Sequence, residues 1–133
     1  MSKLMEKEND IMFDIQSLYD KKYILLETYR KSSAPVKTPV WFVILDGTIH
    51  VVTREDTGKI KRLRNNKSVK IAPCTFNGKS AREWVSGIAR FVTDEESKRA
   101  IELRKQKYGF METIARFVSR KKGKLIVFSI EIK

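Results

Sequence analysis

Six short segments of the chain are rich in β-branched, aliphatic and aromatic residues, and each predicts a β-strand. Such residues fit the pleated, half-buried surface of a sheet. Asp46-Gly47 and Asn77-Gly78 each stand between two of these segments and favour a tight hairpin turn. The six segments are residues 23–29, 40–45, 48–53, 68–76, 82–92 and 124–132.

Prolines and a glycine qualify this strand prediction. Residues 32–39, SSAPVKTP, combine serines with prolines and predict a turn. Pro73 lies inside the fourth segment and predicts an edge strand or a bulge, because proline has no N–H to give to a neighbouring strand. Gly87 in the fifth segment predicts a bend.

Apolar residues at helical spacing predict four helices. In the first, Ile11, Ile15 and Leu18 recur every three or four positions. Thr93 and Glu96 match a capping box and place the start of the third helix at residue 94. The expected helices are residues 4–20, 57–66, 94–107 and 110–119.

Strands that follow one another so closely in a chain of 133 residues predict one domain, mainly β with helices (α+β). Two hairpins and a short helix inserted between strands favour a small six-stranded antiparallel barrel. Residues 1–20 would form a helix packed on the barrel, and residues 21–133 the barrel domain itself.

Residues 52–66, VTREDTGKIKRLRNN, together with the strand that they continue, hold the most informative pattern. A strand runs into a short helix that Thr57 or Asp56 would cap, and six basic residues with no acidic one fall within residues 57–70. A helix start carries unsatisfied N–H groups and partial positive charge, and therefore suits an anion such as a phosphate. The alternative is a solvated, purely structural cationic face.

Composition narrows the classes of function. The net charge of +12, from 28 basic and 16 acidic residues, favours an anionic partner. A single cysteine excludes an internal disulfide, and a single histidine argues against a protein-held transition metal. No apolar run is long enough for a membrane span or a secretory signal, so we expect a cytoplasmic protein without membrane contact.

Four separated words of the sequence resemble the pyridoxamine 5'-phosphate oxidase-like, FMN-binding split β-barrel superfamily. The likeness spans most of the chain after about residue 20 and is closest to the small enzymes that use the deazaflavin coenzyme F-420. The words are TPVWF (38–42), IHVVT with TGKIKRLRNN (49–53 and 57–66), VKIAPC (69–74) and KYGF (107–110).

The resemblance implies a flavin- or deazaflavin-dependent oxidoreductase that transfers a hydride between coenzyme F-420 or FMN and a small organic substrate. It also implies a homodimer with the cofactor in a groove between the subunits. The ring would lie on residues 38–41 and 51–53, and the phosphate on the start of the inserted helix. No side chain is assigned a catalytic role, because the cofactor carries the hydride. The cofactor-binding residues implied in this way are Lys37, Thr38, Pro39, Val40, Trp41, Val52, Thr53, Arg54, Gly58, Lys59, Lys61 and Arg62.

Several alternatives stay open at this point. FMN and the deazaflavin both present a phosphate, and the basic residues Arg54 and Lys37 favour the more acidic deazaflavin. The chain could also be an FMN-binding oxidase-like protein or a cofactor carrier without turnover. Some split-barrel relatives bind haem, for which His50 is the only possible histidine ligand. A nucleic-acid-binding barrel would need exposed aromatic side chains, and nucleic acid is not the expected partner. The aromatic residues in question are Tyr29, Trp41, Phe42 and Phe76.

Overall fold

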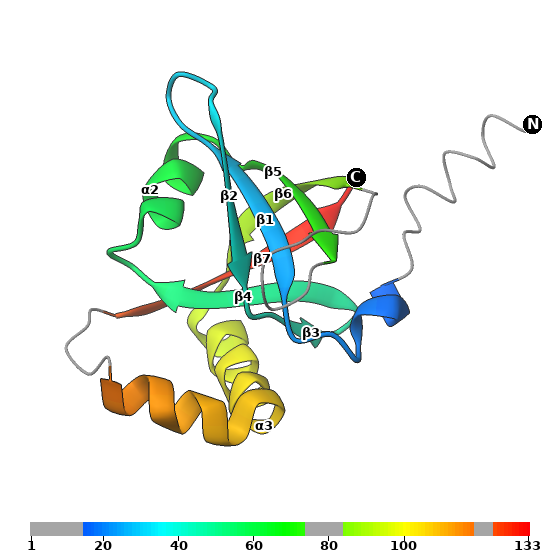
Figure 1. The fold of residues 1–133 in the computed structure, drawn as a ribbon, viewed down its shortest axis with the longest axis vertical. Coiled ribbons are helices and arrows are strands. Elements are labelled where there is room, and N and C mark those ends of the chain that lie inside the picture. Colours follow the sequence, from blue (N-terminus) through cyan, green and yellow to red (C-terminus); the bar gives the residue numbers. More distant parts are fainter. Residues whose placement is uncertain (1–14, 74–83, 119–123) are drawn as a thin grey trace, which may run out of the picture.

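The structure is a computed structural model that describes residues 15–73, 84–118 and 124–133. The described part forms one seven-stranded antiparallel sheet with the strand order β2-β1-β5-β6-β7-β4-β3. Figure 1 shows this sheet curled into an open half-barrel, with helix α2 at one end and helix α3 below β4. The elements are η1 (Ile15–Leu18), β1 (Ile24–Tyr29), β2 (Pro35–Val40), β3 (Val43–Leu45), β4 (Thr48–Arg54), α2 (Gly58–Asn65), β5 (Ser68–Pro73), β6 (Val85–Phe91), α3 (Asp94–Val118) and β7 (Leu125–Ile132).

The seventh strand, β2, comes from residues that the sequence predicted as a turn, and that prediction is wrong for residues 35–39. β2 is an edge strand paired only with β1. Along β2, the backbone N–H groups point alternately toward β1 and away from it. Pro35 and Pro39 are four positions apart and both lie where the N–H would point away, so the missing N–H groups cost no hydrogen bond between the strands. The turn itself is earlier and shorter, and Ser33 donates its N–H to the Arg30 carbonyl at 2.8 Å.

The fourth predicted strand is described from Ser68 to Pro73, and its place in the sheet differs from the expectation. β5 ends at Pro73 and lies between β1 and β6, so the prediction of an edge strand is wrong. Cys74, Phe76 and the Asn77-Gly78 turn lie outside the described residues. The predicted strand over residues 40–45 is also divided, since Val40 ends β2 and β3 begins at Val43.

The helix predictions are largely confirmed within the described residues. α2 begins after Thr57 as expected. The two helices predicted after Thr93 lie within α3 and meet at a kink at Gly109, where φ is 35° and ψ is −106°, so the predicted interruption is confirmed. Of the first predicted helix, the structure describes only residues 15–20, in which η1 is a short 3₁₀ turn. The Asp46-Gly47 hairpin is confirmed, with φ of 53° and 74° at its two residues.

Two hydrophobic clusters lie on opposite faces of β4, because successive strand residues point to opposite sides. Ile49 and Val51 point into the half-barrel, where Ile60 and Leu63 of α2 pack into the same cluster. Val52 points the other way, into the cluster beneath α3. The inner cluster is Leu18, Ile24, Leu26, Val40, Phe42, Ile49, Val51, Ile60, Leu63, Val69, Ile71, Ala89, Phe128 and Ile130. The cluster under α3 is Val43, Leu45, Val52, Ala100, Tyr108 and Val127.

Candidate functional site

The start of α2 leaves its backbone N–H groups without a side-chain cap. Thr57 occupies the N-cap position in an extended conformation, yet it makes no capping hydrogen bond. Its hydroxyl instead donates to the Arg54 carbonyl at 3.0 Å. The first N–H groups of the helix therefore keep their capacity to donate to an anion.

Four cationic side chains gather around this helix start, and we call them the cationic cluster: Arg30, Arg54, Lys59 and Arg62. Burial lowers the pKa of Lys59, and the charges of Arg62 and Arg54 lower it further. The pKa of Arg62 is lowered by burial and then by the charge of Arg30. Each of these shifts shows that the positive charges lie close enough to repel one another.

Arg62 is held in a fixed position inside this cluster. Its Nε donates to the Thr28 hydroxyl of β1 at 2.6 Å. A Cβ atom at Gly58 would lie 2.9 Å from Arg62 Nη1, so the glycine leaves the space that the guanidinium occupies. Within the described part of the chain, the positive charges of Lys59 and Arg62 have no carboxylate partner.

A buried hydroxyl lies on the same face of the edge of the sheet. Thr38 on β2 is paired with Leu26 of β1, and Val36 with Thr28, so Thr38 and Thr28 lie on the inner face, where α2 packs. Within the described part of the chain, Thr38 Oγ1 is buried and has no hydrogen-bond partner. A buried hydroxyl without a partner is costly, and a bound ligand would satisfy it.

Other residues of the predicted set point elsewhere. Lys37 and Pro39 lie on the opposite face of β2, and Lys37 Nζ is 3.9 Å from Glu27 Oε1 and 5.1 Å from the Trp84 ring centre. Val40 is buried in the inner cluster, and Lys61 is exposed on α2. The role of these residues in cofactor binding stays a prediction.

The two predicted residues nearest α3 are Trp41 and Val52. The Trp41 ring stacks on Tyr108, with centroids 4.3 Å apart and an angle of 7° between the planes. Val52 is buried under α3, beside Tyr108 in the same cluster. Their side chains therefore contribute to the docking of α3, on the face of the sheet opposite the cationic cluster.

Two members of the site, Thr28 and Arg30, were missed from the sequence. Thr28 is 34 positions away from the arginine it holds, so no local pattern connects the two. The alternation of residues between the two faces of β1 could have indicated Thr28 in part. Ile24, Leu26 and Thr28 share one face of the strand, which places a polar residue at the end of an apolar row.

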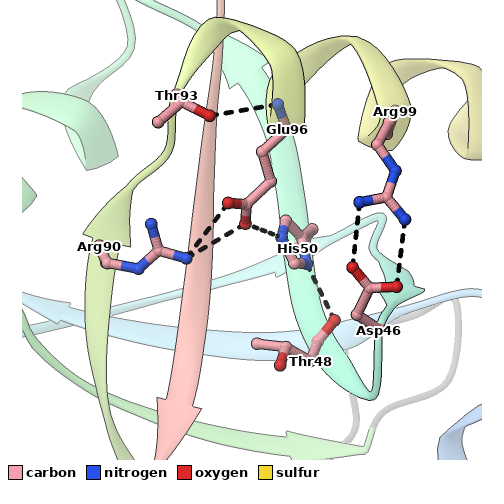
Figure 2. Close-up of polar contacts among 7 residues, drawn as sticks. All are labelled: Asp46, Thr48, His50, Arg90, Thr93, Glu96 and Arg99. Atoms are coloured by element: carbon pink, nitrogen blue, oxygen red, sulfur yellow. Dashed lines mark hydrogen bonds and ion pairs between the residues drawn. The ribbon is translucent and has the colours of Figure 1, made fainter.

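His50 is not available to a haem iron in this structure. Its side chain is only 3% exposed, and Nε2 lies 2.6 Å from Glu96 Oε2 while Nδ1 lies 2.9 Å from the Thr48 carbonyl oxygen (Figure 2). Both ring nitrogens are therefore occupied, and a metal would have to displace one of these contacts. His50 is the single histidine of the chain.

None of the helices in the described part of the chain is long and apolar enough to cross a membrane.

Solved structures show where this fold occurs. HutZ, the haem storage protein from Vibrio cholerae, is 16% identical, covers 92% of this chain and 90% of its own, and has a TM-score of 0.69. A FAD-binding protein from Mesorhizobium loti is 16% identical, with coverages of 89% and 84% and a TM-score of 0.60. A protein from Listeria innocua named for pyridoxamine 5'-phosphate oxidase is 17% identical, with coverages of 98% and 94% and a TM-score of 0.59.

At these identities the likeness shows the fold alone, and it confirms the predicted split-barrel class. No curated protein matches the sequence. The family model of pyridoxamine 5'-phosphate oxidase, however, matches residues 15–133. The chain therefore belongs to the pyridoxamine 5'-phosphate oxidase family.

Proposed function

We propose that this protein is an oxidoreductase that binds a flavin or deazaflavin cofactor through its phosphate at the start of α2. The observation that carries the proposal is the cationic cluster. Lys59 and Arg62 are partly buried, close to further positive charges, and without carboxylate partners in the described part of the chain. Such an arrangement costs stability unless an anion compensates it.

The described residues suggest how the site would hold the cofactor. Lys59 and Arg62 would bind the phosphate oxygens, together with the uncapped N–H groups of α2. Thr28 would keep the guanidinium in place, since it already accepts a hydrogen bond from Arg62 Nε. The buried hydroxyl of Thr38 would bond a polar atom of the same ligand. When bound, the cofactor supplies the hydride transfer, and the protein supplies binding and orientation.

We favour the deazaflavin coenzyme F-420 over FMN on grounds of charge. One phosphate monoester carries at most two negative charges, and Arg30 adds a further cation beside Lys59 and Arg62. The tail of the deazaflavin adds a lactate and glutamates to its phosphodiester and would use the additional positive charge. The reaction would transfer a hydride between the coenzyme and a small organic substrate.

The proposal includes a cytoplasmic homodimer in which the cofactor lies between the subunits, as the resemblance implies. Sedimentation of the purified protein at micromolar concentration would measure this state. A monomer that still binds cofactor tightly would remove the second subunit from the proposal.

Two other functions remain as outcomes of the test. The protein could bind FMN in the manner of an oxidase-like relative, or it could carry cofactor without turnover. Binding of nucleic acid has little support from the described aromatic residues. Phe42 is only 1% exposed, and Trp41 is stacked on Tyr108, so neither offers a free ring face to a base.

The decisive experiment is a titration of cofactor-free protein with FMN and with coenzyme F-420, followed by the fluorescence of each cofactor. We expect the double variant Lys59→Ala, Arg62→Ala to lose about 100-fold or more in affinity, because two charge-assisted contacts disappear. Arg64→Ala is the matched control, since Arg64 lies on the same helix but is exposed. Unchanged binding in the double variant would refute the site, and preference for FMN would refute the choice of deazaflavin.

A further inference from the structure

The first turn of α3 docks on the sheet through a group of charged side chains that the proposed function does not use. These side chains surround a cavity of about 520 Å³ between the β3–β4 hairpin, the end of β6 and α3. Figure 2 shows His50 on β4 and Glu96 on α3 pointing toward each other, with Arg90 approaching from β6. The charged members of the lining are Asp46, Arg90, Glu95, Glu96 and Arg99, in addition to His50.

The contacts of His50 determine how many protons its ring holds. A backbone carbonyl can only accept a hydrogen bond, so the 2.9 Å contact with the Thr48 oxygen requires a proton on Nδ1. In a neutral ring, Nε2 would then be a bare lone pair. Nε2 lies 2.6 Å from Glu96 Oε2, and two lone pairs do not approach so closely without a proton between them.

The neighbouring arginine decides on which partner this second proton resides. Arg90 Nη2 donates to Glu96 Oε2 at 3.1 Å, and an arginine is always a cation. The guanidinium therefore favours an ionised carboxylate over a carboxylic acid at Glu96. The pKa of Glu96 is lowered, first by the hydrogen bond from His50 and also by the charge of Arg90.

The other charges around the cavity do not reverse this assignment. Asp46 of the hairpin forms two contacts of 3.1 Å with Arg99, so its charge is already compensated. Glu95 of α3 is exposed to solvent, which screens it. From β7, the residue paired with His50 is Ser129, which carries no charge.

We propose that His50 is a buried imidazolium and that its ion pair with Glu96 is a protonated latch that holds the first turn of α3 on β4. A ring with one proton cannot donate to both the Glu96 carboxylate and the Thr48 carbonyl, so one of these two contacts is lost and the latch loosens. α3 covers the cluster of Val43, Val52 and Tyr108, so release of its first turn loosens the cover of this part of the sheet. The docking of α3 thereby depends on the number of protons that this ring holds, independently of any cofactor.

The test is ¹⁵N NMR of the imidazole, and assignment is unambiguous because the chain has one histidine. At neutral pH we expect both ring nitrogens of the wild-type protein to carry a proton. Glu96→Gln removes the carboxylate, so in this variant the His50 ring should carry a proton on only one nitrogen. Arg99→Gln is the control, and in this variant the His50 ring should keep the protonation of the wild-type protein. A wild-type ring with only one protonated nitrogen at neutral pH, whether Nδ1 or Nε2, would overturn the proposal.

Amide hydrogen exchange tests the latch itself. We expect the first turn of α3 in the wild-type protein to lose protection when the pH is raised, after correction for the intrinsic exchange rate. In Glu96→Gln the same amides should be less protected at neutral pH and change little with alkali. Equal protection of wild type at neutral and alkaline pH would show that the proton does not control the docking, even if the Gln variant failed to fold.

Discussion

The two helices that pack on opposite faces of the sheet differ in how their charges are compensated. At α2, Lys59 and Arg62 have no carboxylate partner in the described part of the chain, and the nearby charges repel them. At α3, Glu96 contacts both His50 and Arg90, and Asp46 pairs with Arg99. Balanced charges fix the position of a helix, whereas an excess of one sign is a cost that only a ligand offsets.

Lys107 shows that the absence of a carboxylate is not sufficient to define a ligand site. This side chain of α3 also lacks a carboxylate partner in the described residues, and burial lowers its pKa to about 8. Its ammonium, however, donates to the Phe42 carbonyl at 3.0 Å and lies 3.6 Å from the centre of the Phe42 ring. A carbonyl and an aromatic face already solvate this cation. The cluster at α2 combines several cations instead, and that combination distinguishes it.

The largest expected effect of a single substitution on stability is at Tyr108. Its hydroxyl accepts from the Phe42 N–H at 3.0 Å and donates toward the Lys22 and Phe42 carbonyls at 2.7 and 2.9 Å. Tyr108→Phe leaves the buried Phe42 N–H without a partner and removes the hydrogen bond to the Lys22 carbonyl, so we expect a loss of about 2–4 kcal/mol in the free energy of unfolding. Denaturant unfolding measures this loss.

The comparison of the two helices also requires that this variant bind cofactor normally. Tyr29→Phe is the matched control, because among the described residues the Tyr29 hydroxyl donates only to the Glu27 carboxylate, and the side chain is partly exposed. A large loss of cofactor affinity in Tyr108→Phe, at a temperature where it is folded, would show that the α3 side of the sheet belongs to the site after all.

The sequence predicted the α2 region well because its signals are local. Thr57, Gly58 and the cations that follow are adjacent in the chain, and Ile60 and Leu63 are both fully buried at the predicted spacing. The strand β2 was missed because two prolines are a strong turn signal on their own. A strand can contain these prolines here because β2 lies at the edge of the sheet. The order of strands in a sheet cannot be predicted from a short stretch of sequence.

The contacts at α3 were harder to predict because they join residues far apart in the chain. Glu96 was predicted to be half of a capping box. Its backbone N–H donates to the Thr93 hydroxyl at 3.3 Å, as that motif requires. Its carboxylate instead reaches His50, which is 46 positions away. Likewise, the structure stacks Trp41 on Tyr108, which is far from it in the chain, while the contact of Trp41 with a cofactor stays a prediction. Pairing across such distances depends on the register of the sheet.

The second largest expected effect is the loss of stability in acid that comes from Glu96 at the start of α3. The pKa of Glu96 is lowered in the folded protein, whereas an unfolded glutamate titrates near about 4.3. The stabilisation by Glu96 is therefore fully present above that pH and is lost as the pH falls through the lower folded value. We expect Glu96→Gln to be less stable than wild type near neutral pH, and this difference to shrink in acid. Thermal unfolding across that pH range measures it, and a constant difference would contradict the assignment.

A smaller effect, of opposite sign, is expected at α2. Lys59→Gln removes a partly buried charge that neighbouring cations repel, so we expect the cofactor-free protein to gain roughly 0.5–1 kcal/mol of stability. The same variant should bind the cofactor more weakly. Lys61→Gln, on the exposed side of the helix, is the control for helix propensity and net charge. A loss of stability in Lys59→Gln would mean that the lysine is structural, and the contrast between the two helices would disappear.

The smallest effect should come from the Arg99–Asp46 pair. It has good two-point geometry, but the side chains are 55% and 69% exposed. Exposed ion pairs contribute at most about 1 kcal/mol, and salt screens them. We expect Arg99→Gln to reduce stability by roughly 0.5 kcal/mol or less, with the difference vanishing in high salt, as measured by unfolding at two ionic strengths. A larger, salt-insensitive loss would show that this outer pair holds α3 as strongly as the buried His50–Glu96 pair does. The docking of α3 would then depend on both the Arg99–Asp46 pair and the His50–Glu96 pair, and the protonated contact would not be the main one.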